Sequence, residues 1–246
     1  MLSRIVKMQA VRKTDQVSGQ PGSCRNCPAR QQGLCGVLGP KQFALLAREA
    51  RHVRRAAGEE LMADAMPIGS YASLVRGVVK LTKVLEDGRQ QIVGLQFAPD
   101  LVGRPFASES RVSVSAASDV ELCIFPRQTL EALMNESAAL ERRVMLQALR
   151  ELDEARDWMV TLGRKSAAEK VASFLYLAAS HAGPTDKAPG ARFDLPLSRG
   201  DIADFLGLTI ETVSRQISRF RADGVIGIEK RHVSVPDLAR LRLRCG

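Results

Sequence analysis

The sequence contains no apolar run long enough to cross a membrane, since a spanning helix needs about 18 or more consecutive apolar residues. Its N-terminus, MLSRIVKMQAVRKTDQ, carries basic residues but lacks the apolar stretch and the small-residue cleavage site of a secretory signal. Both absences argue against a membrane-spanning or secreted protein. We therefore expect a cytoplasmic protein without a membrane partner.

Histidine is scarce as well. The three histidines, His52, His181 and His232, lie far apart in the sequence and show no spacing typical of metal ligands. No carboxylate–histidine pattern accompanies the cysteines, as a catalytic metal site would require. The sequence therefore does not predict an enzyme.

Acidic residues are outnumbered, because 36 Lys or Arg face 27 Asp or Glu and give a net charge of +9 at pH 7. Residues 1–60 hold 11 basic against 4 acidic side chains, whereas residues 196–246 hold 9 against 6. A basic balance is consistent with nucleic-acid binding. Because most of the excess lies near the N-terminus, the charge does not locate a binding site.

Residues 197–220, LSRGDIADFLGLTIETVSRQISRF, have the pattern of two short helices separated by a tight break. Ser198 and Asp201 form a capping box that begins the first helix. Gly207 ends it, because glycine readily takes the left-handed conformation of a sharp turn. Thr209 can cap the second helix. The apolar residues of that helix recur at helical spacing: Val213, Ile217 and Phe220.

This helix pair predicts a helix-turn-helix whose second helix offers its N-terminal half to the major groove of DNA. Arginine can form two hydrogen bonds to guanine, glutamate can accept one from cytosine, and hydroxyl groups can contact bases or phosphates. The alternative is an ordinary helical hairpin with a solvated polar face. The predicted DNA contacts in and beside the second helix are Thr209, Glu211, Thr212, Ser214, Arg215 and Arg219.

Three of the five cysteines fall within twelve residues, in the pattern C-x2-C-x7-C. Glycine and proline are frequent around Cys24, Cys27 and Cys35, which predicts a loop that can turn the sulfurs toward one metal centre. Such a centre needs a fourth ligand, for which Cys123 is the first candidate and His52 the second. Spacing alone leaves an iron–sulfur cluster, a zinc site and unligated thiols open, since thiolates suit both metals.

The middle of the chain changes from the strand pattern to the helix pattern. Short alternating or β-branched runs between residues 53 and 125 predict a compact all-β sandwich or roll. Residues 138–162 then form one long helix with a heptad seam, which favours dimerisation over packing on the chain's own β domain. Arg156 borders the seam and needs a partner there. The seam residues are Met145, Ala148, Leu152, Ala155, Met159 and Leu162.

The C-terminal part reads as a winged helix-turn-helix. Residues 226–228 and 232–235 resemble two small strands around a turn that can place Lys230 or Arg231 on a phosphate. Cys245, one residue from the end, is expected to be a free exposed thiol. The fold class is therefore α+β, divided into an N-terminal arm with the cysteine loop, a β-roll sensor domain, a dimerisation helix and a DNA-binding domain, at residues 1–40, 41–136, 137–163 and 164–246.

This order of parts resembles the cyclic-AMP receptor and fumarate-and-nitrate-reduction regulator (CRP/FNR) superfamily, in particular its FNR-like oxygen-sensing subgroup. The resemblance covers nearly the whole chain. It is most specific in SRGDIADFLGLTIETVSRQISRF, in Asp100-Leu101-Val102-Gly103, in EDGRQQIVGLQF and in LCIFPRQTLEAL.

The resemblance implies that the protein is an oxygen-responsive transcription regulator of anaerobic or microaerobic genes. By this likeness, an oxygen-labile [4Fe–4S] cluster on the four cysteines, Cys24, Cys27, Cys35 and Cys123, favours the homodimer. Glu211, Ser214 and Arg215 match the residues that read palindromes of the kind TTGAT-N4-ATCAA, and Arg199 matches a phosphate contact. The turn at Asp87-Gly88 resembles a surface that touches RNA polymerase. A regulator of the same fold that uses the cysteines for zinc or as a thiol redox switch remains the alternative.

One departure concerns the nucleotide-binding members of the superfamily. They carry glutamate after a glycine, whereas Gly103 is followed here by Arg104 and Pro105. Arg111 is the only basic candidate nearby for the nucleotide phosphate. We therefore do not expect a cyclic-nucleotide site.

Overall fold

The computed structural model describes residues 24, 27–182 and 190–246. Backbone contacts divide the chain into two compact units, one formed by residues 1–89 and 93–152 and the other by residues 90–92 and 153–246. The predicted domain boundaries stay predictions.

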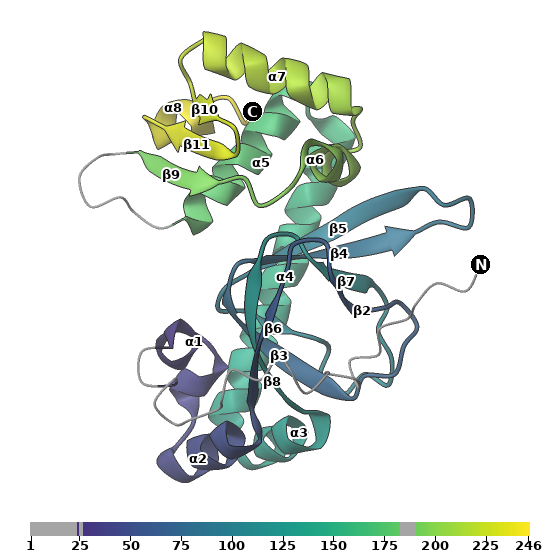
Figure 1. Ribbon diagram of the computed structural model, residues 1–246, viewed down its shortest axis with the longest axis vertical. Coiled ribbons are helices and arrows are strands. Elements are labelled where there is room, and N and C mark those ends of the chain that lie inside the picture. Colours follow the sequence, from purple (N-terminus) through teal and green to yellow (C-terminus); the bar gives the residue numbers. More distant parts are fainter. Residues whose placement is uncertain (1–23, 25–26, 183–189) are drawn as a thin grey trace. The chain divides into compact units, whose positions relative to one another are not determined.

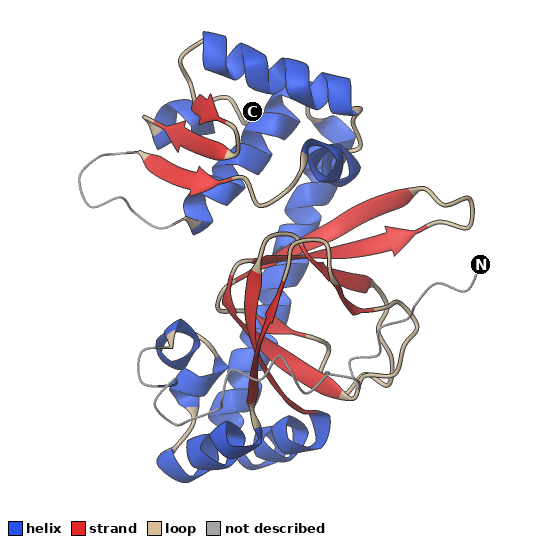
Figure 2. Ribbon diagram, viewed as in Figure 1, coloured by secondary structure: helices blue, strands red, loops and turns tan. Residues whose placement is uncertain are grey.

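The first unit is built on two four-stranded sheets (Figures 1 and 2). Each runs mainly antiparallel, and apolar and polar side chains alternate along most strands, as one buried face requires. One sheet has the order β1 (Arg51–Arg55), β8 (Val120–Pro126), β3 (Ser70–Arg76) and β6 (Leu101–Val102). The other has the order β2 (Glu60–Met62), β7 (Ser113–Ala116), β4 (Val78–Val84) and β5 (Gln90–Phe97).

The two sheets share an apolar core. Val53, Leu74 and Leu122 of the first sheet pack with Val79 and Val114 of the second, and all five side chains are buried. Burial of a large aliphatic side chain contributes about 1.5–3 kcal/mol. This core closes the sheets into the predicted roll.

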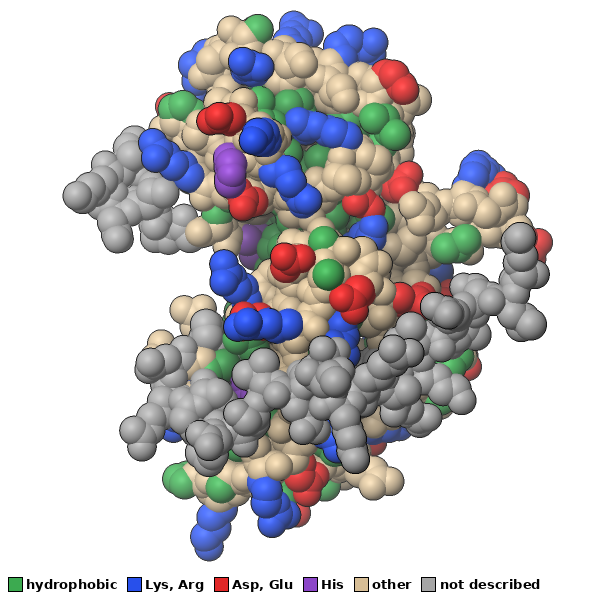
Figure 3. All heavy atoms as spheres, viewed as in Figure 1, with side chains coloured by type: hydrophobic (Ala, Val, Ile, Leu, Met, Phe, Trp, Pro, Cys, Tyr) green, Lys and Arg blue, Asp and Glu red, His purple; other side chains and the backbone are tan. Residues whose placement is uncertain are grey.

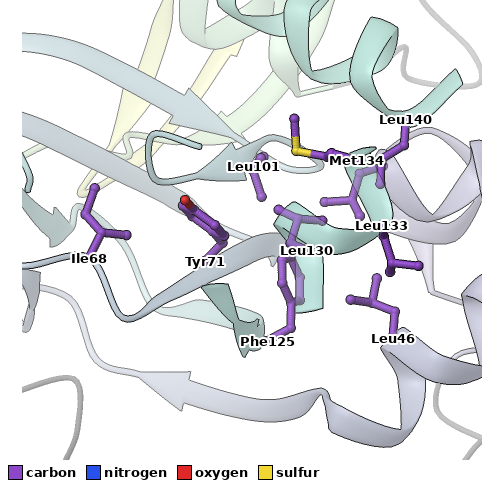
Figure 4. Packing of buried hydrophobic residues seen from close by; sticks show 10 residues of the cluster. Leu46, Ile68, Tyr71, Leu101, Phe125, Leu130, Leu133, Met134 and Leu140 are labelled. Atoms are coloured by element: carbon purple, nitrogen blue, oxygen red, sulfur yellow. The ribbon is translucent and has the colours of Figure 1, made fainter. Parts of the chain in front are cut away.

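A second apolar cluster covers the outer face of the β1–β8–β3–β6 sheet. It joins Tyr71 and Phe125 of the strands to residues of α2 (Pro40–Glu49), α3 (Arg127–Glu136) and the start of α4 (Ala138–Arg164). Figure 4 shows these side chains turned toward one another between strand and helix. The helical members of this outer cluster are Leu46, Leu130, Leu133, Met134 and Leu140.

The cysteine segment is not the plain loop that the glycines and prolines predict. It contains the one-turn helix α1 (Pro28–Gln31) and the 3-10 helix η2 (Leu34–Val37). A Cβ on Gly36 would lie 2.8 Å from the carbonyl oxygen of Arg30, so glycine permits the two short helices to pack closely. Leu34 anchors the segment in the outer cluster.

The second unit combines four helices with a small sheet. Helix α5 (Ala167–His181) packs with α6 (Arg199–Leu206), α7 (Ile210–Ala222) and α8 (Leu238–Arg242), and the sheet has the order β10 (Gly227–Glu229), β11 (His232–Val235) and β9 (Ala191–Asp194). Phe205 lies at the centre, 4.4 Å from the ring of Trp158 and 6.1 Å from that of Phe174. The predicted α+β class, with roll, long helix and winged helix-turn-helix, is confirmed.

Cys245 differs from its prediction. It is buried rather than exposed, because α8 packs on α5 and carries the last residues inward. Its thiol points at the carbonyl oxygen of Leu241, 3.5 Å away.

Among the helices of the described residues, none is both long and apolar enough to cross a membrane.

Candidate functional site

Local hydrogen bonds fix the helix-turn-helix. The Ser198 hydroxyl accepts from the backbone nitrogen of Asp201, whose carboxylate in turn accepts from the backbone nitrogen of Ser198. Gly207 takes φ +60° between the helices, the left-handed conformation that the turn requires. Thr209 caps α7 by accepting from the backbone nitrogen of Thr212, 3.2 Å away. The break therefore has a fixed geometry.

The two faces of α7 divide as the spacing predicts. Val213, Ile217 and Phe220 are buried against the rest of the unit. The outer face is polar: Thr209, Glu211, Arg215 and Arg219 are exposed, and Thr212 and Ser214 are half-buried.

Within that outer face, Arg215 and Glu211 are held near the cap of α7. Arg215 donates to the Thr212 hydroxyl at 3.4 Å. Hydrogen bonds from its own backbone and from Thr209 lower the pKa of Glu211, so its carboxylate stays ionised and can accept from a base. A donor and an acceptor of base edges thus stand side by side.

Arg199 begins α6 and is half-buried. Burial lowers the pKa of its guanidinium, and one terminal nitrogen, Nη1, is buried without a hydrogen-bond partner among the described residues. The structure thus leaves a cation at the N-terminal end of the helix pair, where anions are also attracted to the helix dipole.

The wing places Lys230 at the tip of the β10–β11 hairpin. Lys230 has φ +55° and an exposed side chain, as a tight turn requires. Arg231 is turned back, because it donates to the carbonyl oxygen of Leu195 at 2.8 Å. Figure 3 shows Lys and Arg side chains spread over the visible face, so total charge does not mark the binding surface.

The four candidate metal ligands come from two segments. Cys35 of η2 and Cys123 of β8 both pack against the outer cluster and are half-buried, as are Cys24 and Cys27. Burial, and then the negative charge of neighbouring cysteines, raises the pKa of Cys35 and of Cys123 to about 12. For Cys123 all three other cysteines contribute, so the fold gathers the four sulfurs in one neighbourhood.

The sulfurs are gathered but not closed around one point. In the described part of the chain, no three His, Cys, Asp or Glu side chains stand in a geometry that could hold a metal ion. The two findings agree, because the charges of cysteines change one another's pKa over longer distances than a metal–sulfur bond of about 2.3 Å. The structure thus brings the four cysteines into one neighbourhood without a formed metal site among the described residues.

His52, the second candidate for the fourth ligand, is a direct neighbour of Cys123. Strand β1 opposes His52 to Cys123, and strand β3 opposes Ser73 to the same cysteine. Sequence reasoning missed Ser73 and strand β1. The alternation in Arg51–Arg55 around the apolar Val53 was the available signal.

The predicted seam on α4 lies on an open face. Met145, Leu152 and Met159 are 54%, 45% and 72% exposed, Ala148 and Ala155 are exposed, and Leu162 is half-buried. Arg156 donates to Asp153 at 3.1 Å, which supplies a partner for its charge. The exposed apolar residues that the heptad did not include are Leu146, Leu149 and Val160.

The segment after Gly103 is occupied by the chain's own contacts. Glu131 of α3 accepts from the Tyr71 hydroxyl at 2.5 Å and from the backbone nitrogen of Phe106 at 2.9 Å, and pairs with Arg127 at 2.9 Å. Arg111 is exposed and pairs with Glu109 at 3.8 Å. Neither observation supports a cyclic-nucleotide site, which stays unexpected.

Comparison with known proteins agrees with this architecture. A cyclic nucleotide-binding domain profile matches residues 52–137, and a Crp-like helix-turn-helix domain profile matches residues 169–244. A protein of Rhizobium leguminosarum bv. viciae named "Probable transcriptional activator" is 53% identical over 225 residues, which cover 91% of this chain and 93% of that protein.

Two further relatives agree. The transcriptional activator protein FnrL of Cereibacter sphaeroides is 40% identical over 231 residues, covering 91% of this chain and 92% of FnrL. The structure of FixK2 from Bradyrhizobium japonicum is 31% identical with a TM-score of 0.73, and covers 80% of this chain and 98% of that one. The chain therefore belongs to the CRP/FNR family of DNA-binding transcription regulators.

Proposed function

We propose that the protein is a homodimeric transcription activator that binds DNA when a [4Fe–4S] cluster is held by Cys24, Cys27, Cys35 and Cys123. Oxygen destroys this cluster and so abolishes DNA binding. The observation that carries the proposal is the shared packing of the cysteine segment and the long helix. Leu34, next to Cys35, and Leu140 of α4 are buried in the same outer cluster, and Val144 packs against it. A change at the cysteines therefore reaches the dimerisation helix through close-packed side chains.

The donor set fits such a group. Four half-buried cysteines from two segments supply the soft thiolates that iron–sulfur clusters and zinc prefer. When bound, a [4Fe–4S] cluster supplies reactivity toward oxygen. The chain's own contribution is to pack Cys35 of η2 and Cys123 of β8 against the same outer cluster that buries Leu34 and Leu140 of α4.

The open apolar face of α4 supports dimerisation. Exposed Met145, Leu152 and Met159 recur every seven residues, with exposed Ala148 and Ala155 between them, as in a coiled-coil seam, and a second copy of the helix would bury them. Pairing through α4 gives the dimer two copies of α7, as a palindromic target requires. We expect Glu211, Ser214 and Arg215 to read TTGAT-N4-ATCAA-like sites, while Arg199 and Lys230 contact phosphates.

Activation needs a surface for RNA polymerase, which we assign to the turn around Asp87-Gly88. Leu85 and Val84 beside it are 53% and 56% exposed. Relatives named as activators support the direction of regulation.

Anaerobic purification followed by iron, sulfide and zinc analysis tests the proposal. We expect iron and sulfide in about equal amounts on a dimer, and DNA binding that is lost after exposure to air. Zinc without sulfide would contradict the cluster and favour a zinc site on the same cysteines. Metal-free protein that binds DNA in air and loses binding with a thiol oxidant would favour the redox switch instead.

A further inference from the structure

Three side chains form a row across the outer face of the first sheet. Cys123 of the central strand β8 is directly opposed by His52 of β1 and by Ser73 of β3. Directly opposed residues of antiparallel strands point to the same side, with Cβ atoms about 4.5–5.5 Å apart. The row therefore lies on the face that carries the outer cluster and the cysteine segment.

Both neighbours of Cys123 carry an unused polar atom. Ser73 is 1% exposed, and its hydroxyl has no hydrogen-bond partner among the described residues. The Nε2 atom of His52 is likewise buried and unpartnered there. Two of the five such side-chain atoms in the described chain thus flank a single cysteine, although most buried polar groups are hydrogen-bonded.

The missing partner is best supplied by sulfur. A neutral thiol is a weak acceptor, whereas a thiolate bound to a metal carries negative charge and attracts donors. A serine hydroxyl and the Nε2–H tautomer of histidine are both donors. Hydrogen bonds to ligand sulfurs are among the features that set the reduction potential of an iron–sulfur cluster.

We propose that His52 and Ser73 donate hydrogen bonds to the sulfur of Cys123 when it ligates the cluster, and that they slow the destruction of the cluster by oxygen. The inference rests on the proposed function. Each donor withdraws electron density from the ligand sulfur, so the cluster gives up an electron to oxygen less readily. His52 is thus a positioning residue beside the ligand set and not its fourth member.

The test compares full-length variants that are loaded with the cluster without oxygen and then mixed with air-saturated buffer. We expect Ser73→Ala and His52→Leu each to lose the visible absorption of the cluster about tenfold faster than the wild type, since partners of metal ligands typically change metal-site properties by about 10–100-fold. The iron–sulfur stretching bands in resonance Raman spectra should shift as well. His52→Gln, which keeps an N–H donor, should recover part of the wild-type rate.

Two controls separate this role from a structural one. His181→Leu replaces an exposed histidine of α5, which belongs to the second unit and lies outside the proposed ligand set, and should change neither the rate of cluster loss nor the bands. Ser73→Ala should also raise the midpoint of thermal unfolding of the cluster-free chain, because it removes an unpaired buried hydroxyl. A merely structural serine would lower that midpoint.

The outcomes distinguish this inference from the proposed function. Wild-type chain without iron or sulfide overturns both. Loaded Ser73→Ala and His52→Leu that lose the cluster at the wild-type rate with unshifted bands overturn only the donor role. Loss of all iron in His52→Leu, with iron retained in Cys123→Ser, would make His52 the ligand and also overturn it.

Discussion

The helix-turn-helix takes its parts from residues 198–222, whereas the cysteine site joins residues 24–37 to a strand that begins at Val120. In the first, the capping bonds connect residues three positions apart. In the second, the cysteines come into one neighbourhood because β8 lies between β1 and β3 under the outer cluster. The helix-turn-helix therefore depends on local sequence and the cysteine site on tertiary packing, so substitutions in the two should fail in different ways.

The strongest test of this difference is Cys123→Ser. We expect it to abolish cluster binding and with it anaerobic DNA binding, because no other cysteine of the described chain lies in the β8 strand. Iron and sulfide analysis and DNA binding without oxygen measure the effect.

Cys245→Ser is the matched control. It changes a buried cysteine of the second unit that is not part of the proposed ligand set, and should keep iron, sulfide and DNA binding. Full iron and sulfide content in Cys123→Ser would contradict the proposed ligand set.

The second comparison concerns polar networks. Glu131 is contacted by Tyr71 and Phe106, which are 60 and 25 residues away in sequence, whereas Ser198 is bonded by Asp201. Glu131→Gln should lower the free energy of unfolding of the first unit by about 2 kcal/mol, since hydrogen bonds to charged groups contribute about 1.5–3 kcal/mol. Ser198→Ala should cost the second unit about 1 kcal/mol. Urea unfolding followed separately for each unit measures both.

The loss in Glu131→Gln should depend on pH. Burial acts to raise the pKa of Glu131, but hydrogen bonds from Tyr71, Phe106 and Arg127 outweigh it and hold the pKa below 4.5. A carboxylate with a lowered folded pKa stabilises fully above its unfolded pKa, and its contribution disappears as pH falls through the folded value. The gap between wild type and Glu131→Gln should therefore be constant near neutral pH and shrink below about pH 4.5. A gap that widens on acidification would contradict the assignment.

The same contrast explains what the sequence could predict. The helix-turn-helix was predicted with its caps and its glycine turn because Ser198, Gly207 and Thr209 act on their immediate neighbours. Strand β6 was missed because a two-residue strand has no periodicity of its own and exists through pairing with β3.

The cysteine segment and the C-terminus were mispredicted for a related reason. Gly36 looked like a loop signal, yet it serves a close approach between two short helices. Cys245 looked exposed because chain ends usually are. It is buried because α8, capped by Asp237, docks on α5. Neither the close approach at Gly36 nor the docking of α8 on α5 produces a recognisable pattern in the neighbouring sequence.

Arg215→Ala tests base recognition by the helix-turn-helix. A side chain that forms two hydrogen bonds to a base typically contributes about 1–3 kcal/mol of discrimination, so Arg215→Ala should remove about that much at one base pair of each half-site if Arg215 reads a base as proposed. Binding to operators with single substitutions, measured without oxygen, shows whether the loss is confined to that base pair. Equal weakening on all sequences would make Arg215 a phosphate contact.

A matched control for Arg215 lies in the same helix. Arg221→Ala removes an exposed arginine in the last turn of α7, outside the predicted contacts. It should leave discrimination unchanged, and both variants should keep the iron and sulfide of the wild type.

The smallest expected effect is at Gly207, where a substitution changes only the cost of the left-handed backbone conformation. A Cβ there would meet nothing within 4 Å, so Gly207→Ala should cost only the left-handed conformation, about 1 kcal/mol of unfolding free energy in the second unit. Gly207→Asn should cost less, because asparagine adopts that conformation more readily. At Gly36 the added Cβ meets the backbone oxygens of Arg30 and Gln31, so asparagine should be no better than alanine. Asparagine that rescues Gly36 as well would show that the cysteine segment, too, is governed by local conformation.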